Sequence, residues 1–111
     1  MKYYKLNGQK ISRLGFGCMR FKTLDDDNGK IDKDVSSRIL LEAIDKGLTY
    51  IDTAYPYHDK MSEKFLGEFI EENNLRYKIQ LTSKLPCWLV KEKDDFYKIF
   101  NEHWIILGLT T

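Results

Sequence analysis

Residues 48–58 read LTYIDTAYPYH, and this stretch decides the fold. Its first part, up to Asp52, is apolar and β-prone, as expected of a short strand. Apolar side chains recur at helical spacing before it, at 35–44, and after it, at 65–70. A strand between two amphipathic helices predicts βα units and therefore a parallel sheet.

The rest of the chain continues this alternation. Residues 3–12 turn at Asn7-Gly8, the strongest short signal for a β-hairpin. An apolar run with two glycines, at 13–19, predicts a strand, and another strand is expected at 79–83. After the hairpin the order is therefore strand–helix three times, with right-handed crossovers that place the helices outside the strands.

Polar residues mark the expected helix starts. Asp32 or Asp34 can cap the first helix, and Ser62 can cap the second. The third helix is expected to begin at Asp94 or Asp95, because the apolar periodicity starts directly after them.

Composition restricts the class of protein. The chain has 111 residues, 42% of them hydrophobic and 32% charged, which is typical of one globular domain. A net charge of +1 provides no field that would attract nucleic acid or anionic lipid. The longest apolar run, 104–109, is far shorter than the ~20 residues of a membrane span, and the N-terminus has no signal-peptide pattern. We therefore expect a cytoplasmic protein with no membrane or nucleic-acid partner.

Three ionisable residues fall at the predicted carboxyl ends of strands, where parallel α/β proteins form their sites: Asp52, Tyr57 and Lys84. Taken singly, Asp52 could be a turn residue, Tyr57 a core aromatic and Lys84 a solvated charge. Taken together they suggest acid–base chemistry, because a phenol ionises near pH 10 and a nearby ammonium makes it a stronger acid. A carboxylate can hold the ammonium in place, so the three could donate a proton to a carbonyl oxygen.

Three ordered motifs resemble those of the aldo/keto reductase family, most closely a bacterial branch of it. Residues 52–58, DTAYPYH, resemble the family's Asp-x-Ala-x-x-Tyr signature. Residues 14–20, LGFGCMR, resemble its first barrel strand, and residues 82–86, TSKLP, resemble its third strand with the active-site lysine. The resemblance implies a (β/α)8 TIM barrel that binds NADPH, or NADH, and reduces a small aldehyde or ketone.

The resemblance also implies residue roles. Tyr57 would protonate the carbonyl oxygen, Lys84 would increase the acidity of that phenol, and Asp52 would pair with Lys84. Gly17, Cys18 and Met19, together with Asp52, would lie near the nicotinamide end of the cofactor.

The histidines and cysteines offer no metal site, because Cys18, Cys87, His58 and His103 lack zinc-ligand spacing. Both cysteines are expected to pack as small apolar groups. His58 directly follows Tyr57 and could line the pocket, but a solvated loop residue is the favoured interpretation. His103 falls inside the third helix, so it cannot replace the histidine that the family carries at the end of its fourth strand.

Length sets the main departure from the family. A (β/α)8 barrel takes about 250 residues, so 111 residues supply an opening hairpin and about three of its eight βα units. We therefore expect residues 1–111 to form a single, incomplete barrel domain with only part of an active site.

A second hypothesis is a non-catalytic fragment that acts by self-association or by binding a partner. Three barrel strands cannot close on themselves, so open strand edges are expected. Leu14, Phe16, Ile51 and Leu81 are the residues predicted to line the uncovered face, and the apolar stretch Trp104–Leu107 would add to it.

Overall fold

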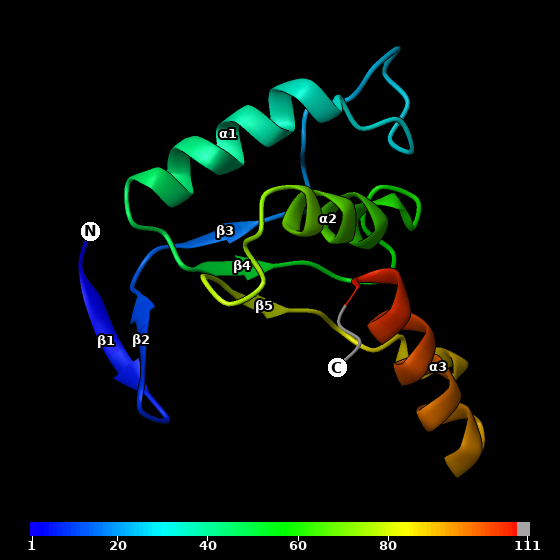
Figure 1. Cartoon of the computed structure of the whole chain (residues 1–111). Coiled ribbons are helices and arrows are strands. Elements are labelled where there is room, and N and C mark those ends of the chain that lie inside the picture. The colour runs from blue at the N-terminus through cyan, green and yellow to red at the C-terminus, as the bar shows by residue number, and fades with distance from the viewer. Residues whose placement is uncertain (109–111) are drawn as a thin grey trace.

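The structure, a computed structural model, describes residues 1–108. Leu109, the end of the apolar run, lies outside them. Five strands, three α-helices and one short 3₁₀ helix follow one another along this part of the chain (Figure 1). They are β1 (Tyr3–Leu6), β2 (Gln9–Ser12), β3 (Gly15–Gly17), α1 (Lys33–Asp45), β4 (Tyr50–Asp52), α2 (Met61–Glu72), β5 (Gln80–Thr82), η1 (Cys87–Leu89) and α3 (Lys93–Ile106).

The predicted hairpin is confirmed. β1 and β2 pair antiparallel and form a sheet of their own. Asn7 and Gly8 both adopt positive φ angles, 51° and 79°, as this tight turn requires. Ser12 anchors the hairpin to the start of β4, because its backbone N–H and its hydroxyl both bond to Thr49.

The main sheet has three parallel strands in the order β3-β4-β5, which confirms the predicted βα alternation. Phe16, Ile51 and Leu81 lie side by side in one row of its register. This row contributes to the hydrophobic core, which the helices complete. α1 and α2 lie on the same face of the sheet, and α3 lies beyond its β5 edge (Figure 1).

The expectation that Phe16, Ile51 and Leu81 line an uncovered face is therefore wrong. Ile51 is completely buried, and the other two are partly buried against the core; only Leu14, which precedes β3, is largely exposed. The reason is the twofold alternation of a strand, which turns these side chains toward the helices. The face of the sheet away from the helices carries glycines and residues with polar groups: Gly15, Gly17, Tyr50, Asp52, Gln80 and Thr82.

The helix starts differ in how well they follow the sequence. Asp32 caps α1 as predicted, since its carboxylate accepts from the backbone N–H of Val35 at 3.2 Å. Ser62 does not cap α2 and instead lies buried inside the first turn. The cap position belongs to Lys60, which follows two other left-handed residues, so a tight turn rather than a capping side chain starts this helix.

α3 begins at Lys93, slightly before the predicted Asp94 or Asp95, and Glu92 and Asp95 form a reciprocal capping box there. Its C-terminal end packs on α2, where a Cβ at Gly67 would collide with the carbonyl of Ile106. The apolar stretch at this end divides between two environments. Leu107 is buried in the core, whereas Ile105 and Ile106 are exposed.

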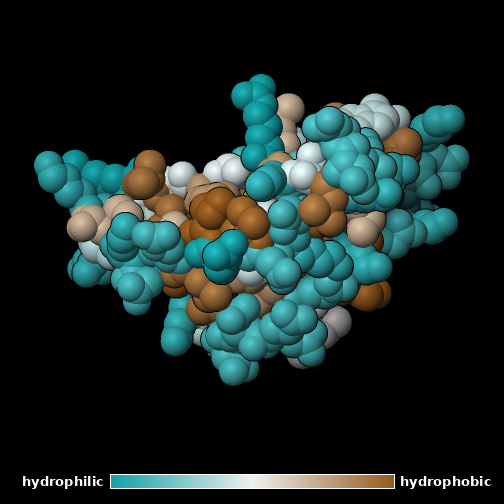
Figure 2. Space-filling model, turned by 90° about the horizontal axis from the view of Figure 1, so that it is seen from above, coloured by the Kyte–Doolittle hydropathy of each residue, from teal (hydrophilic) through white to brown (hydrophobic). Residues whose placement is uncertain are grey.

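The molecule is a flat slab with extents of 42 × 42 × 22 Å. Its radius of gyration, 14.6 Å, exceeds the roughly 13 Å of a compact domain of this length. Its accessible surface of 7781 Å² likewise exceeds the roughly 6,400 Å² expected for a compact monomer of this mass. Seen from the side on which α1 lies, the surface is mainly hydrophilic with a limited hydrophobic patch (Figure 2).

Candidate active site

The ammonium of Lys84 is the centre of a polar cluster at the carboxyl ends of β4 and β5. Its Nζ lies 3.0 Å from both carboxylate oxygens of Asp52. It also lies 3.0 Å from the backbone oxygen of Thr53 and 3.0 Å from the hydroxyl oxygen of Tyr57. The structure therefore brings the three residues singled out in the sequence into direct contact. Asp52, Tyr57 and Lys84 together form the Lys84 cluster.

Local structure explains this arrangement. Asp52 is the last residue of β4, on the face of the sheet away from α1 and α2, and Lys84 follows β5 by two positions. The backbone N–H of Thr53 donates to the carbonyl of Thr82 at 2.8 Å, which extends the strand pairing up to the cluster. Tyr57 reaches it from the turn between β4 and α2. Parallel pairing of adjacent strands thus places the charged ends side by side.

The directions of the hydrogen bonds leave one proton free. Lys84 donates to the Tyr57 oxygen, so the phenolic hydrogen remains available for another acceptor. Burial alone lowers the pKa of Lys84, but the hydrogen bonds to Tyr57 and Asp52 and the carboxylate charge outweigh it and raise that pKa above its ordinary value. Lys84 therefore stays an ammonium at neutral pH. Its side chain is 51% exposed, so the cluster is open to a ligand.

The turn after β3 lies beside this cluster. Gly17 is paired in register with Asp52, and no atom lies within 4 Å of the place where a Cβ would stand. Cys18 holds the turn in place, since its N–H donates to the Asp52 carbonyl at 2.9 Å and its own carbonyl accepts from Ser62. Met19 is largely exposed. The turn therefore presents Gly17 and Met19, rather than the Cys18 side chain, toward open space.

The two cysteines differ, contrary to expectation. Cys18 is completely buried, whereas Cys87 is exposed. Burial raises the pKa of the Cys18 thiol to about 12; the charge of Asp52 adds to this effect and that of Lys84 opposes it. Cys18 is thus a protonated, apolar packing group and not a nucleophile.

The expectation that His58 is a solvated loop residue is wrong. His58 is 2% exposed, with Nε2 accepting from the backbone N–H of Phe21 at 2.8 Å and Nδ1 lying 2.9 Å from the carbonyl of Asn28. These contacts make it a structural tie between two loops. Neither they nor its position bring it into the Lys84 cluster.

A second polar network joins α2, α3 and the end of β5, and of its residues the sequence predicted a role only for Ser62, as a helix cap. Glu63 of α2 is buried, accepts from Ser83 at 2.8 Å and lies 3.0 Å from Nδ1 of His103. Ser62 of the same helix bonds to the hydroxyl of Thr53. The available signal was the Ser62-Glu63 pair itself, because two polar residues open a helix whose following positions are apolar.

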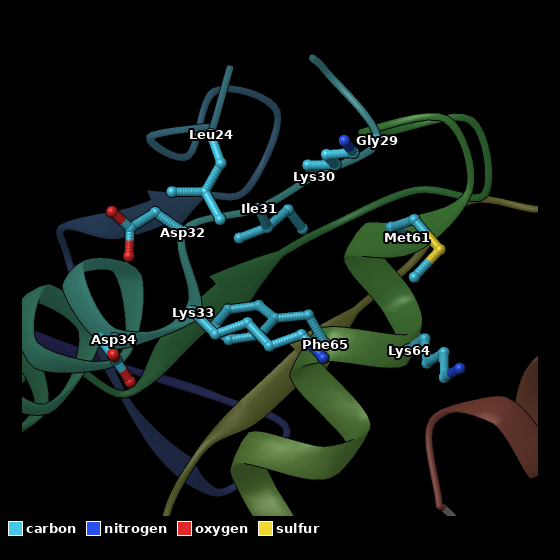
Figure 3. Close-up of a pocket in the computed structure, with 10 residues that line it drawn as sticks. All are labelled: Leu24, Gly29, Lys30, Ile31, Asp32, Lys33, Asp34, Met61, Lys64 and Phe65. Atoms are coloured by element: carbon cyan, nitrogen blue, oxygen red, sulfur yellow. The ribbon is translucent and has the colours of Figure 1, made fainter. Parts of the chain in front are cut away.

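Two cavities lie next to α2 and β5, the elements that flank the Lys84 cluster. The larger, about 600 Å³, is bounded by the loop before α1 and by the first turns of α1 and α2, with Ile31 and Phe65 among its lining residues (Figure 3). None of its lining residues belongs to the Lys84 cluster. A smaller cavity of about 310 Å³ lies between β5 and α3 and is lined by Lys84 itself, with Phe100 and Trp104. The open space beside the reactive groups is therefore the smaller of the two.

Neither a metal-binding group of histidine, cysteine or acidic side chains nor a helix long and apolar enough to cross a membrane occurs within residues 1–108.

Comparisons of the sequence and of the structure with known proteins both find aldo/keto reductases. The model of the aldo/keto reductase family matches residues 13–105. An aldo-keto reductase of Gibberella moniliformis is 32% identical over 104 residues, which cover 93% of this chain and 30% of that protein. The uncharacterized oxidoreductase YqkF of Bacillus subtilis is 36% identical over 74 residues, covering 67% of this chain and 21% of that protein.

The similar solved structures are aldo-keto reductases as well. The thermostable aldo-keto reductase Tm1743 superposes with a TM-score of 0.71 at 28% identity, over 97% of this chain and 39% of that one. An aldo-keto reductase from Klebsiella pneumoniae in complex with NADPH superposes with a TM-score of 0.71 at 25% identity, over 89% of this chain and 32% of that one. The predicted fold class, the N-terminal portion of a (β/α)8 TIM barrel, is thereby confirmed, and the chain spans about a third of these relatives. The chain belongs to the aldo/keto reductase family.

Proposed function

We propose that this chain contributes the proton-donating part of an NADPH-dependent reductase of small aldehydes or ketones. The observation that carries the proposal is the contact between Lys84 and Tyr57, 3.0 Å apart, with Asp52 and the Thr53 carbonyl holding the lysine. Family membership supports an oxidoreductase. The site residues are Tyr57, Lys84 and Asp52 for the proton transfer, with Gly17, Cys18, Met19 and Asp52 on the cofactor side.

Tyr57 is the proton donor in this proposal. Its hydroxyl oxygen accepts from Lys84, so the hydrogen can point toward a carbonyl oxygen of the substrate. The positive charge of Lys84 stabilises the phenolate that forms when the proton leaves. Asp52 neutralises Lys84 and fixes its direction through two oxygens. The cluster thus acts as a general acid for carbonyl reduction, a contribution typically worth about 10²–10⁴-fold in rate.

The residues present fit the reactive end of a nicotinamide cofactor. Gly17 leaves open space beside Asp52, which a side chain at that position would fill. The exposed side chain of Met19 borders the same turn. NADPH, when bound, supplies the hydride that reduces the carbonyl carbon, and NADH would supply the same chemistry. The Klebsiella pneumoniae relative in complex with NADPH supports this choice of cofactor.

We further propose that residues 1–111 form one incomplete barrel domain, which supplies only part of the contacts to a nicotinamide cofactor. A (β/α)8 barrel has eight such units, and the chain matches about 39% of one such relative.

The test is a complete barrel in which residues 1–108 of this chain are joined to the later units of Tm1743. Tyr57→Phe in this chimera should lower turnover of small aldehydes by about 10²-fold or more and leave cofactor affinity nearly unchanged, because the ring remains but the proton does not. Tyr77→Phe is the matched control, since Tyr77 is 98% exposed. Steady-state turnover and fluorescence titration with NADPH measure the two quantities, and near-normal turnover of Tyr57→Phe would contradict the proposal.

A second candidate function is association with a second copy or another chain. The observation that favours it is the open sheet: among residues 1–108, β3 and β5 each pair with β4 alone. Such edges offer free backbone donors and acceptors to another strand.

A further inference from the structure

The buried pair of Glu63 and His103 lies where two segments of the candidate site must be held. Glu63 is on α2 and is 2% exposed, and the His103 side chain on α3 is 10% exposed. The carboxylate oxygen Oε2 of Glu63 lies 3.0 Å from His103 Nδ1 and accepts from the Ser83 hydroxyl at 2.8 Å. One carboxylate oxygen thus joins α2, α3 and the end of β5.

Glu63 and His103 each contact a residue that is close in sequence to a member of the Lys84 cluster. Ser83 directly precedes Lys84 in a segment that has no regular secondary structure, and its hydroxyl donates to Glu63. The His103 ring packs on the ring of Tyr55, with centroids 4.9 Å apart, and Tyr55 lies two positions before Tyr57. The pair therefore touches both segments that deliver the proposed acid and its ammonium.

Packing alone does not explain an acidic group at this place. An apolar pair of similar volume would hold α3 against α2 without the cost of removing a carboxylate from water. What Glu63 adds is direction, because a hydrogen bond to the Ser83 hydroxyl fixes orientation as well as distance.

We propose that Glu63 and His103 are positioning residues, which hold Ser83 and Tyr55 so that Lys84 and Tyr57 meet at hydrogen-bond distance. The inference rests on the proposed function, since it gives the pair a purpose in carbonyl reduction. The pair itself touches neither substrate nor cofactor and acts through its neighbours.

The experiment reads the position of Lys84 directly in the full 111-residue chain, without cofactor or turnover. Lysine labelled with ¹³C at Cε reports the titration of each ammonium by NMR, and Lys84→Arg identifies the signal of interest. Contacts with Asp52 and Tyr57 should make Lys84 titrate at higher pH than the exposed lysines. Ser83→Ala removes the hydroxyl that binds Glu63, so the Lys84 titration should move toward that of the exposed lysines.

Three further variants make the result specific. Ser83→Thr keeps the hydroxyl and should retain the wild-type titration. His103→Phe keeps a ring on Tyr55 but removes one partner of Glu63, so it should shift Lys84 in the same direction and carries the test where Ser83→Ala does not fold. Ser12→Ala is the matched control, because it also deletes buried hydroxyl contacts, to Leu14 and Thr49, at the opposite end of the sheet.

An unchanged Lys84 titration in a folded Ser83→Ala or His103→Phe chain, checked by circular dichroism, would overturn the proposal. An equal shift in Ser12→Ala would also overturn it, since the effect would then be general loosening. The outcome is independent of the activity test. If the Lys84 titration is unchanged in Ser83→Ala and the Tyr57→Phe chimera is inactive, only the positioning role is refuted. If the Tyr57→Phe chimera remains active, the proposed function is refuted.

Discussion

The imidazole Nε2 of His58 accepts a hydrogen bond from the backbone N–H of Phe21, 2.8 Å away and 37 residues earlier in the chain. Nδ1 faces the carbonyl of Asn28 at 2.9 Å, and the ring of Phe21 stacks on the imidazole with centroids 5.6 Å apart. A neutral imidazole with its hydrogen on Nδ1 satisfies both backbone groups at once. His58 therefore ties the loop before α1 to the turn that carries Tyr57.

Replacing this tie should cost stability. His58→Phe keeps a stacked ring but leaves the Phe21 N–H and the Asn28 carbonyl without partners, which should lower the free energy of unfolding by about 1–3 kcal/mol. Urea unfolding followed by circular dichroism, at fixed protein concentration, measures the change. Tyr77→Phe, at an exposed position, should be neutral. A His58→Phe chain as stable as the wild type would show that the two backbone groups find other partners.

Alkaline pH should destabilise the fold through Cys18. Its thiol has a pKa of about 12 in the folded chain, against 9.0 ordinarily, because it is buried. Between these values the folded state keeps a proton that the unfolded state has lost, so the free energy of unfolding falls as the pH rises. One such group contributes at most about 1.4 kcal/mol per pH unit.

Cys18→Ala removes this titration, so its free energy of unfolding should fall less steeply above pH 9 than that of the wild type. Cys87→Ala is the control, because Cys87 is exposed, and it should keep the wild-type slope. Urea unfolding at a series of pH values gives the slopes. Parallel slopes for Cys18→Ala and the wild type would contradict the assignment.

The 111-residue chain by itself should show no measurable NADPH-dependent reduction. Catalysis requires hydride donor, carbonyl and acid to be held within reacting distance, and loss of that alignment costs orders of magnitude. Here the Lys84 side chain is 51% exposed, and the chain spans only 39% of the length of the reductase Tm1743. Nicotinamide absorbance, followed with a panel of small aldehydes, is the measurement. Turnover that follows the purified protein and disappears with Lys84→Met would disprove this expectation.

The same chain should associate with itself in solution. In the part of the chain that the structure describes, β3 and β5 pair with β4 alone, and exposed apolar side chains line α3, among them Phe100 and Ile105. Light scattering after size exclusion, over a range of concentrations, should reveal dimers or larger species, whereas one sharp species of 13.2 kDa would contradict the prediction. Ile105→Glu should weaken association by about tenfold or more, because a buried isoleucine contributes roughly 1.5–3 kcal/mol. Ile39→Glu on α1 is the matched control, since Ile39 is also an exposed helical isoleucine but lies outside α3.

Features set by neighbouring residues could be predicted from the sequence. The hairpin at Asn7-Gly8 and the cap at Asp32 depend on conformational preferences within a few positions, and both are confirmed. The strand–helix order follows from apolar periodicity, and parallel pairing then brings Asp52 and Lys84 to one edge.

Features set by distant residues could not be predicted. The burial of His58 depends on a loop 37 residues earlier folding back onto it. Ser62 has the chemistry of a cap, but the left-handed turn before α2 places it one residue inside the helix. The direction of the Ile51 side chain could not be predicted, because a short apolar run hides the alternation that turns every second side chain toward the helices.

Every hydrogen-bond partner of the Lys84 ammonium lies within residues 52–57. The contacts of Lys84 are therefore made within one continuous stretch, residues 52–84. On a ribosome, these contacts can form once β4 and β5 have paired, and the contact between Glu63 and His103 follows when α3 has been synthesised. In evolution, a continuous stretch of this kind can be inherited as a unit, so changes elsewhere in a barrel can occur without separating Lys84 from Asp52 and Tyr57.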